Sequence, residues 1–122
     1  MFNEIIVENF SSPRYAEELA AADLTLELGN PVCGDRIRVQ LRLDGGTVRA
    51  ARYQAWGCAT SLATGNIFCG AIEGKPLSAA RATAPADMAA MLGELEPSQH
   101  HCLEMLRALF EQLNQKTAAG SA

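Results

Sequence analysis

The segment from Arg36 to Leu43 constrains the fold more than any other part of this 122-residue chain. Aliphatic residues occupy every second position, and three arginines and a glutamine occupy the others. This period of two predicts a strand with one buried face and one exposed face. The following Asp44-Gly45-Gly46 predicts a hairpin turn, because glycine readily adopts a positive φ. Thr47 to Ala55 then returns as the neighbouring strand, and its alternation slips near Ala50-Ala51, which indicates a bulge.

The other elements follow from the remaining periodicity and from the turn residues. We expect a helical N-terminal segment over about residues 1–20, broken near Ser12-Pro13, and a strand over 24–28. Helices are predicted over 60–73, 77–81, 85–92 and from about 96 to 115, with a frayed tail over 116–122. Because strands precede helices, the fold class is α+β: a three-stranded antiparallel sheet with helices packed on one face, in a single domain over residues 1–122.

Composition narrows the classes of function. The chain is 48% hydrophobic and carries 10 basic and 14 acidic residues, and its net charge of -4 argues against a nucleic-acid partner. No run approaches the roughly 20 apolar residues that span a bilayer, so no membrane association is expected. The first residues lack the basic start and the cleavage site of a signal peptide, which favours a cytoplasmic location. In that reducing compartment, four cysteines indicate metal binding or catalysis before disulfides.

Three of the cysteines have local signatures of a metal site. Cys33 is followed two residues later by Asp35, and an extended chain would turn both side chains to one side. Cys58 follows Gly57 at the change from strand to helix, where the helix N-terminus favours a thiolate. Cys102 follows His101 near the start of the last helix. Three thiolates with one carboxylate and one imidazole would complete a site for a soft or borderline metal.

Each motif also has a simpler interpretation when it is taken alone. Cys33-Gly34-Asp35 would also suit an ordinary turn, and Cys58 would suit a tight buried corner. Cys102 could be a core cysteine beside a surface histidine, and spacing cannot choose between His100 and His101 as a ligand.

The fourth cysteine, Cys69, is expected to pack in the core. It follows Cys58 by three turns of one predicted helix, so about 16 Å separates the two and one metal cannot bind both. The chain has no C-x-x-C motif and no glycine-rich phosphate loop. A Cys–His nucleophile pair is conceivable, but it would leave the other motifs unexplained.

Taken in order, the motifs resemble the U-type iron–sulfur cluster assembly scaffolds, the IscU/SufU/NifU N-terminal family. The similarity runs from about Ile5 to Leu113. The segments that carry it are Ser12-Pro13-Arg14, Asn30-Pro31-Val32-Cys33-Gly34-Asp35-Arg36, Leu43-Asp44-Gly45, Ala51-Arg52-Tyr53, Gly57-Cys58, Gly74-Lys75 and His101-Cys102.

The resemblance implies a fold, a cargo and partners. The family fold is a three-stranded antiparallel sheet with helices on one face. Cys33, Cys58 and Cys102 would hold a transient [2Fe–2S] cluster, accompanied by Asp35 and His101. A cysteine desulfurase would supply sulfur as persulfide to one of the three cysteines, and the cluster would pass to apo-proteins. Such a chain is a scaffold and carrier rather than an enzyme, and isolated members often carry zinc in the same site.

The chain departs from the family pattern in places that concern partners. Ala59 stands where a glycine is usual. Residues 95–99 stand where the IscU branch has Leu-Pro-Pro-Val-Lys, and Glu96 and Gln99 argue against a dedicated chaperone. Residues 33–38 look closer to the SufU branch, yet the chain lacks the SufU insertion and keeps His101, so the branch stays open.

Two other functions and one surface feature remain as alternatives. The chain could be a zinc-bound sulfur acceptor, a sulfurtransferase that activates a desulfurase, or a purely structural zinc domain. Half of the basic residues form an arginine cluster that fits either a solvated sheet face or a docking surface for an acidic partner. Its members are Arg36, Arg38, Arg42, Arg49 and Arg52.

Overall fold

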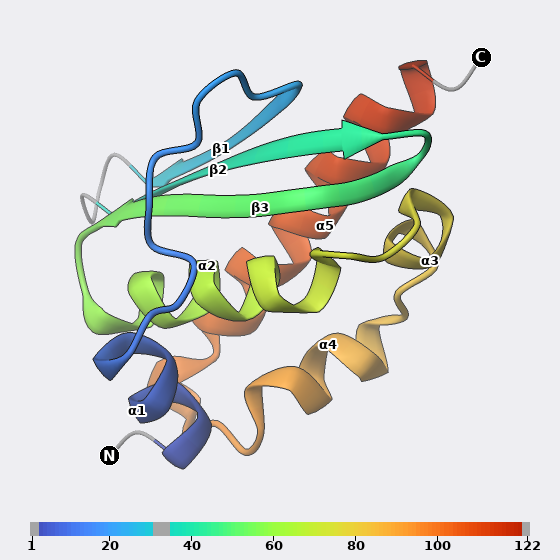
Figure 1. Cartoon of the computed structure of the whole chain (residues 1–122). Helices are drawn as coiled ribbons and strands as arrows, with labels where there is room; N and C mark the ends of the chain where they lie inside the picture. Colours follow the sequence, from blue (N-terminus) through green and yellow to red (C-terminus); the bar gives the residue numbers. More distant parts are fainter. Residues whose placement is uncertain (1–2, 31–34, 121–122) are drawn as a thin grey trace.

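The sheet and its helical layer confirm the predicted α+β class. The computed structural model describes residues 3–30 and 35–120, without the side chains of Asn30, Ser98 and 118–120. The three strands form an antiparallel sheet in the order β1-β2-β3, and the helices lie on one side of it (Figure 1). Within the described residues, no helix is long and apolar enough to cross a membrane.

The bounds of most elements match those expected from the sequence. The predicted strands 24–28, 36–43 and 47–55 and helices 60–73, 77–81 and 85–92 are confirmed, with ends that move by no more than two residues. The elements are β1 (Leu24–Asn30), β2 (Asp35–Asp44), β3 (Thr47–Trp56), α1 (Glu4–Ser11), α2 (Ala59–Ile72), α3 (Leu77–Arg81), α4 (Pro85–Leu92), a 3-10 helix (Pro97–Gln99) and α5 (His101–Gly120).

The hairpin between β2 and β3 forms as the sequence indicated. Gly45 and Gly46 have φ values of 57° and 87°, which glycine adopts without steric cost. The register shifts between Arg42 and Leu43, which lie opposite Ala50 and Val48. This irregularity confirms the expected bulge near residue 50.

Helix α5 begins and ends later than expected. It starts at His101, after a separate 3-10 helix over Pro97–Gln99, rather than near residue 96. Its end lies further along the chain because its last turns pack beside β1. The helix continues to Gly120 rather than ending near residue 115. Thr117 is buried, and the Lys116 Nζ donates a hydrogen bond of 2.6 Å to the Thr25 carbonyl. Residues 116–120 are therefore helical, contrary to the expected frayed end.

The core lies between the sheet and helices α2 and α5. Ile37, Val39 and Leu41 on the inward face of β2 are at most 1% exposed. Cys69 on α2 is fully buried, which confirms that it packs in the core, and burial raises the pKa of its thiol. The rings of Phe68 and Phe110 meet edge to face at 4.9 Å and join α2 to α5.

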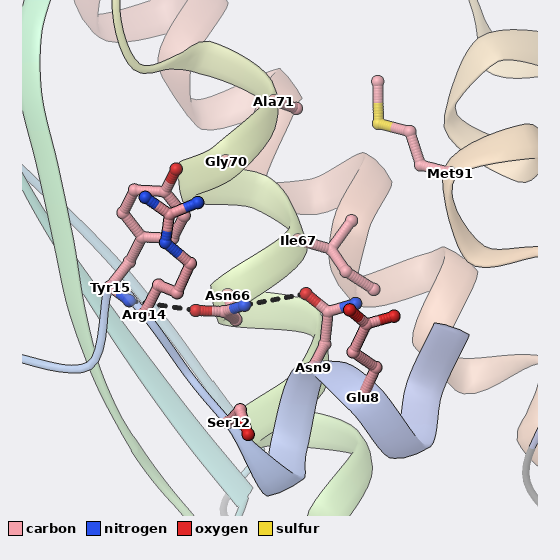
Figure 2. A pocket seen from close by; sticks show the side chains of 10 residues that line it. All are labelled: Glu8, Asn9, Ser12, Arg14, Tyr15, Asn66, Ile67, Gly70, Ala71 and Met91. Atoms are coloured by element: carbon pink, nitrogen blue, oxygen red, sulfur yellow. Dashed lines mark hydrogen bonds between the residues drawn. The ribbon is translucent and has the colours of Figure 1, made fainter. Parts of the chain in front are cut away.

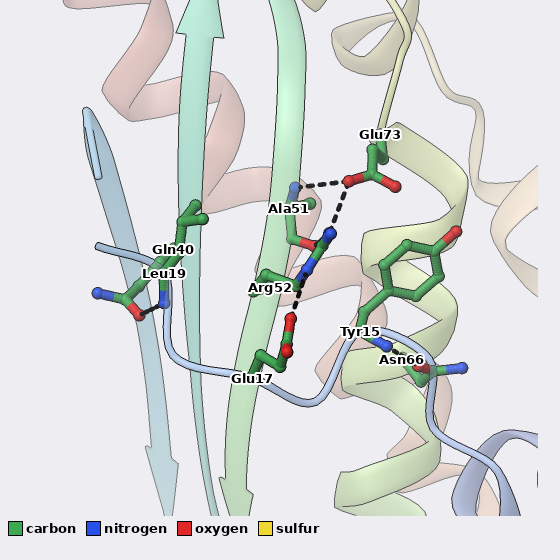
Figure 3. Close-up of polar contacts among 8 residues, drawn as sticks. All are labelled: Tyr15, Glu17, Leu19, Gln40, Ala51, Arg52, Asn66 and Glu73. Carbon is green, nitrogen blue, oxygen red and sulfur yellow. Dashed lines mark hydrogen bonds and ion pairs between the residues drawn. The ribbon is translucent and has the colours of Figure 1, made fainter. Parts of the chain in front are cut away.

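The prediction of a helix in the second half of the N-terminal segment, after Ser12-Pro13, is wrong. After α1 the chain runs along the edge of β3 and over the outer face of the sheet (Figure 3). The Tyr53 N–H donates to the Tyr15 carbonyl at 2.9 Å, and the Leu19 N–H donates to the Gln40 side chain at 2.9 Å. Gln40 was expected on the wet face but is only 7% exposed. Contacts with the sheet replace the backbone hydrogen bonds that a second helix would have supplied.

A pocket of about 410 Å³ lies among α1, residues 12–15, α2 and α4 (Figure 2). The Asn66 side chain accepts a hydrogen bond from the Tyr15 N–H and donates one to the Asn9 Oδ1. These two bonds fix the N-terminal segment to α2. None of the described residues that line this pocket is a cysteine or a histidine, so it is separate from the candidate metal site.

Candidate metal centre

Asp35, Cys58 and His101 converge at one end of the molecule. Each offers a ligand atom, and these atoms all lie within 4.8 Å of one another. Asp35 begins β2, Cys58 is the N-cap of α2 and His101 begins α5, so the fold brings together residues that are distant in sequence.

A close backbone approach at Gly57 makes this convergence possible. Gly57 has a φ of 118°, and a Cβ atom there would lie 2.1 Å from the Asp35 Oδ1. The Cys58 N–H donates a hydrogen bond of 3.1 Å to the same oxygen, and the Cys58 Sγ lies 3.6 Å from the Asp35 Oδ2. The Asp35 carboxylate therefore holds the start of α2, and only glycine fits before Cys58.

The exposure of Cys58 and of the neighbouring histidines decides which side chains a metal ion could reach from solvent. Cys58 is exposed at the N-terminus of α2, so its sulfur atom is accessible to an incoming metal ion or sulfur donor. His101 is half-buried and belongs to the group, whereas His100 is exposed and outside it. The geometry thus selects His101 as the candidate between the two histidines.

Cys102 does not belong to this group. It is fully buried and is not one of the three clustered residues. Burial raises the pKa of its thiol, while hydrogen bonds with Thr60 and Thr64 act in the opposite direction and the Cys58 charge raises the pKa further. Burial agrees with the simpler expectation of a core cysteine, and the role of Cys102 as a ligand stays a prediction.

Cys33, the remaining cysteine of the expected site, lies outside the described residues. The expected convergence of the sulfur atoms of residues 33, 58 and 102 therefore stays a prediction as well. Its partner in the motif, Asp35, lies in the cluster.

Three buried hydroxyl side chains lie beside the cluster, and the sequence did not predict them as part of the site. Thr60, Ser61 and Thr64 lie in the first two turns of α2 and are at most 2% exposed. The Thr60 Oγ1 lies 2.6 Å from the Cys58 Sγ and 2.9 Å from the His101 Nε2. Their signal was three hydroxyl residues within seven positions of Cys58 in an otherwise mostly apolar helix.

The clustered donors suit zinc or iron. A carboxylate oxygen, a thiol sulfur and an imidazole nitrogen are the ligand types that these borderline metals accept. Three protein donors leave further coordination positions for sulfide, for another thiolate or for an incoming group. The three residues therefore form a candidate metal site with open coordination positions.

Comparisons of sequence place the chain among known proteins. A family model described as the NifU-like N terminal domain matches residues 1–115. The zinc-dependent sulfurtransferase SufU of Bacillus subtilis (strain 168) is 32% identical over 80 residues, which cover 66% of this chain and 54% of that protein. The iron–sulfur cluster assembly scaffold protein IscU of Escherichia coli (strain K12) is 29% identical over 105 residues, covering 83% and 81%. The chain thus spans about half the length of the SufU relative.

Comparisons of structure agree on the fold. A protein described as an iron–sulfur cluster assembly scaffold for the SUF system, from Fervidobacterium islandicum AW-1, superposes with a TM-score of 0.62 at 19% identity. The alignment covers 95% of this chain and 84% of that one. A NifU-like N-terminal protein from Brucella abortus gives a TM-score of 0.58 at 20% identity, covering 92% and 80%. Because the family model matches residues 1–115 of the 122-residue chain, the chain belongs to the family of NifU-like N terminal domains.

Proposed function

We propose that the protein is a scaffold on which a [2Fe–2S] cluster is assembled and from which it passes to apo-proteins. Cys33, Cys58 and Cys102 are the proposed cysteine ligands, accompanied by Asp35 and His101. The observation that carries the proposal is the cluster of Asp35, Cys58 and His101, whose ligand atoms lie within 4.8 Å of one another. Relatives of this family are named iron–sulfur cluster assembly scaffolds, which supports the same function.

The mixed donor set suits a protein that must release its cargo. Thiolates bind iron and sulfide strongly, whereas an oxygen or a nitrogen donor binds a cluster less tightly. Asp35→Cys is therefore expected to slow cluster transfer to an acceptor protein. Unchanged transfer kinetics in this variant would contradict the role given to the mixed set.

A cysteine desulfurase is the proposed sulfur donor. In this step a thiolate of the scaffold attacks the outer sulfur of the desulfurase persulfide, and the desulfurase thiolate leaves. Cys58 is the exposed candidate acceptor, while Cys33 and Cys102 remain alternatives. The reduction of this sulfur to sulfide requires electrons from a thiol or another reductant.

The arginine cluster gives limited support to a docking surface. Glu27 pairs with Arg36 at 3.3 Å and with Arg38 at 3.8 Å, and Asp44 pairs with Arg49 at 3.3 Å. Arg52 contacts two further carboxylates of the chain. Because at least four of the five arginines have acidic neighbours among the described residues, the solvated-face interpretation is favoured. Reversal of two of these charges is expected to leave the affinity for the desulfurase unchanged.

The second candidate function is a zinc-bound sulfur acceptor that activates a desulfurase without building a cluster. The observation that favours it is the similarity to the SufU of Bacillus subtilis, a protein named a zinc-dependent sulfurtransferase. The same donor atoms would serve both functions, so the geometry of the site does not separate them.

Anaerobic reconstitution separates the two functions. The protein is incubated with ferrous iron, L-cysteine, a thiol reductant and a cysteine desulfurase, and its visible absorption is recorded. A scaffold gives a brown protein whose absorption then moves to an added apo-acceptor. A colourless protein that still accelerates the desulfurase would overturn the scaffold and favour the sulfur acceptor.

A further inference from the structure

The hydroxyl of Thr60 connects the two helix N-termini of the metal centre. Thr60 is in the first turn of α2, two residues after Cys58, and is 2% exposed. Its Oγ1 lies 2.6 Å from the Cys58 Sγ and 2.9 Å from the His101 Nε2. One buried hydroxyl therefore contacts a sulfur atom and a nitrogen atom that belong to candidate ligands on different helices.

The contact with His101 excludes coordination through the same nitrogen. If Nε2 carries the proton, it donates to the Thr60 hydroxyl and has no free lone pair for a metal. If Nε2 is unprotonated, its single lone pair accepts the hydroxyl proton. In either tautomer, a metal that binds the His101 Nε2 must first break the contact with Thr60.

The position of the hydroxyl oxygen resembles that of a bound ion. Zinc binds cysteine sulfur at about 2.3 Å and histidine nitrogen at about 2.0–2.1 Å. The Thr60 oxygen contacts the corresponding atoms of Cys58 and His101 at 2.6 and 2.9 Å. The oxygen thus bridges the same pair of donors at somewhat longer distances.

We propose that Thr60 is an internal placeholder that competes with the metal for Cys58 and His101. Its hydroxyl holds these two side chains while the site is empty and gives way when a metal binds. The competition lowers the affinity of the site and so favours release. The link to release rests on the proposed scaffold function, whereas the competition itself concerns only metal binding.

Zinc affinity tests the competition directly. Thr60→Val removes the hydroxyl at nearly constant shape, and Thr60→Ser keeps it. Thr117→Val is the matched control, because Thr117 is also buried and donates its hydroxyl to the Leu113 carbonyl, away from the site. Dissociation constants for zinc are measured at fixed pH by competition with a chromophoric chelator.

The loss of two net hydrogen bonds from the empty site should tighten zinc binding by about 5- to 150-fold in the Thr60→Val variant. The Thr60→Ser and Thr117→Val variants should remain within about twofold of the wild type. If Thr60 instead orients the loaded site, Thr60→Val should weaken zinc binding by about 10- to 100-fold. Weaker or unchanged binding would overturn the placeholder.

A measurement on the wild-type protein keeps the proposal testable if Thr60→Val does not fold. Long-range ¹H–¹⁵N NMR spectra of the imidazole distinguish coordination through Nε2 from coordination through Nδ1. Zinc addition is expected to shift the Nε2 resonance of His101 as the coordinated nitrogen. Coordination through Nδ1, with the contact to Thr60 retained, would overturn the proposal. Neither test involves cluster assembly. A negative result in the zinc or NMR experiment would therefore reject the role of Thr60, whereas a negative reconstitution would reject the scaffold function.

Discussion

Gly57→Ala is expected to weaken the fold and the metal centre together. At a φ of 118°, a residue with a side chain costs about 1–3 kcal/mol of backbone strain. The new Cβ atom would lie 2.1 Å from the Asp35 Oδ1, so the carboxylate must move away from the Cys58 N–H. The lost hydrogen bond to a charged group adds about 1.5–3 kcal/mol. The free energy of unfolding should therefore fall by about 3–6 kcal/mol.

Gly74→Ala provides the matched control for backbone strain. Gly74 has a φ of 81°, but a Cβ atom there would meet no atom within 4 Å. Its cost should be limited to the strain of about 1–3 kcal/mol. Urea unfolding followed by circular dichroism measures both variants, and chelator competition measures their zinc affinity. Zinc binding should weaken at least tenfold only in Gly57→Ala. Equal losses of stability and equal zinc affinities in the two variants would refute the role given to the Gly57–Asp35 contact.

Three further predictions concern pH, the sheet edge and the metal. Burial raises the pKa values of Cys69 and Tyr53 above their ordinary 9.0 and 10.0, so the native state keeps protons that the unfolded chain loses. The free energy of unfolding should fall above about pH 9, and Cys69→Ala should make the fall shallower; an identical pH profile would contradict this. The Gln112 side chain pairs with both the N–H and the carbonyl of Glu27 on the β1 edge, so Gln112→Ala should cost about 1–2 kcal/mol in urea unfolding and increase self-association in sedimentation. An unchanged unfolding midpoint would contradict this edge protection. Removal of zinc with a chelator should leave the circular dichroism spectrum largely unchanged, because the core is built from large buried side chains; unfolding would instead favour a structural zinc domain.

The sheet could be predicted because its determinants are local. The alternation over Arg36–Leu43 fixes which face of β2 is buried, and Gly45 and Gly46 fix the turn. The exception on the wet face, Gln40, depends on a segment about 20 residues earlier. Periodicity within β2 contains no information about that contact.

Two of the errors in the helices have the same kind of cause. Residues after α1 lose their predicted helix to hydrogen bonds with β3 and with the side chains of Asn66 and Gln40. Helix α5 continues past residue 115 because the Lys116 side chain bonds to the Thr25 carbonyl of β1 and the Thr117 side chain is buried. In both cases tertiary contacts outweigh the modest differences in local propensity.

For the candidate metal centre, the sequence predicted the types of ligand but not how the side chains around them are arranged. The residue types around Cys58 and His101 indicated a metal centre, and the fold brings these two together with Asp35. The burial of Cys102 and the bridging hydroxyl of Thr60 depend on how α2 and α5 pack, which spacing along the chain does not encode.

The central claim is that a cluster is assembled at the surface site that contains Cys58, and a pair of cysteine variants tests it most directly. Cys58→Ser removes a proposed ligand, while Cys69→Ser changes a buried cysteine of the core. Both are reconstituted beside the wild type, and the visible absorption per chain is compared. We predict that Cys69→Ser retains the wild-type absorption and that Cys58→Ser loses most of it. Full absorption in the Cys58→Ser variant would contradict the assignment.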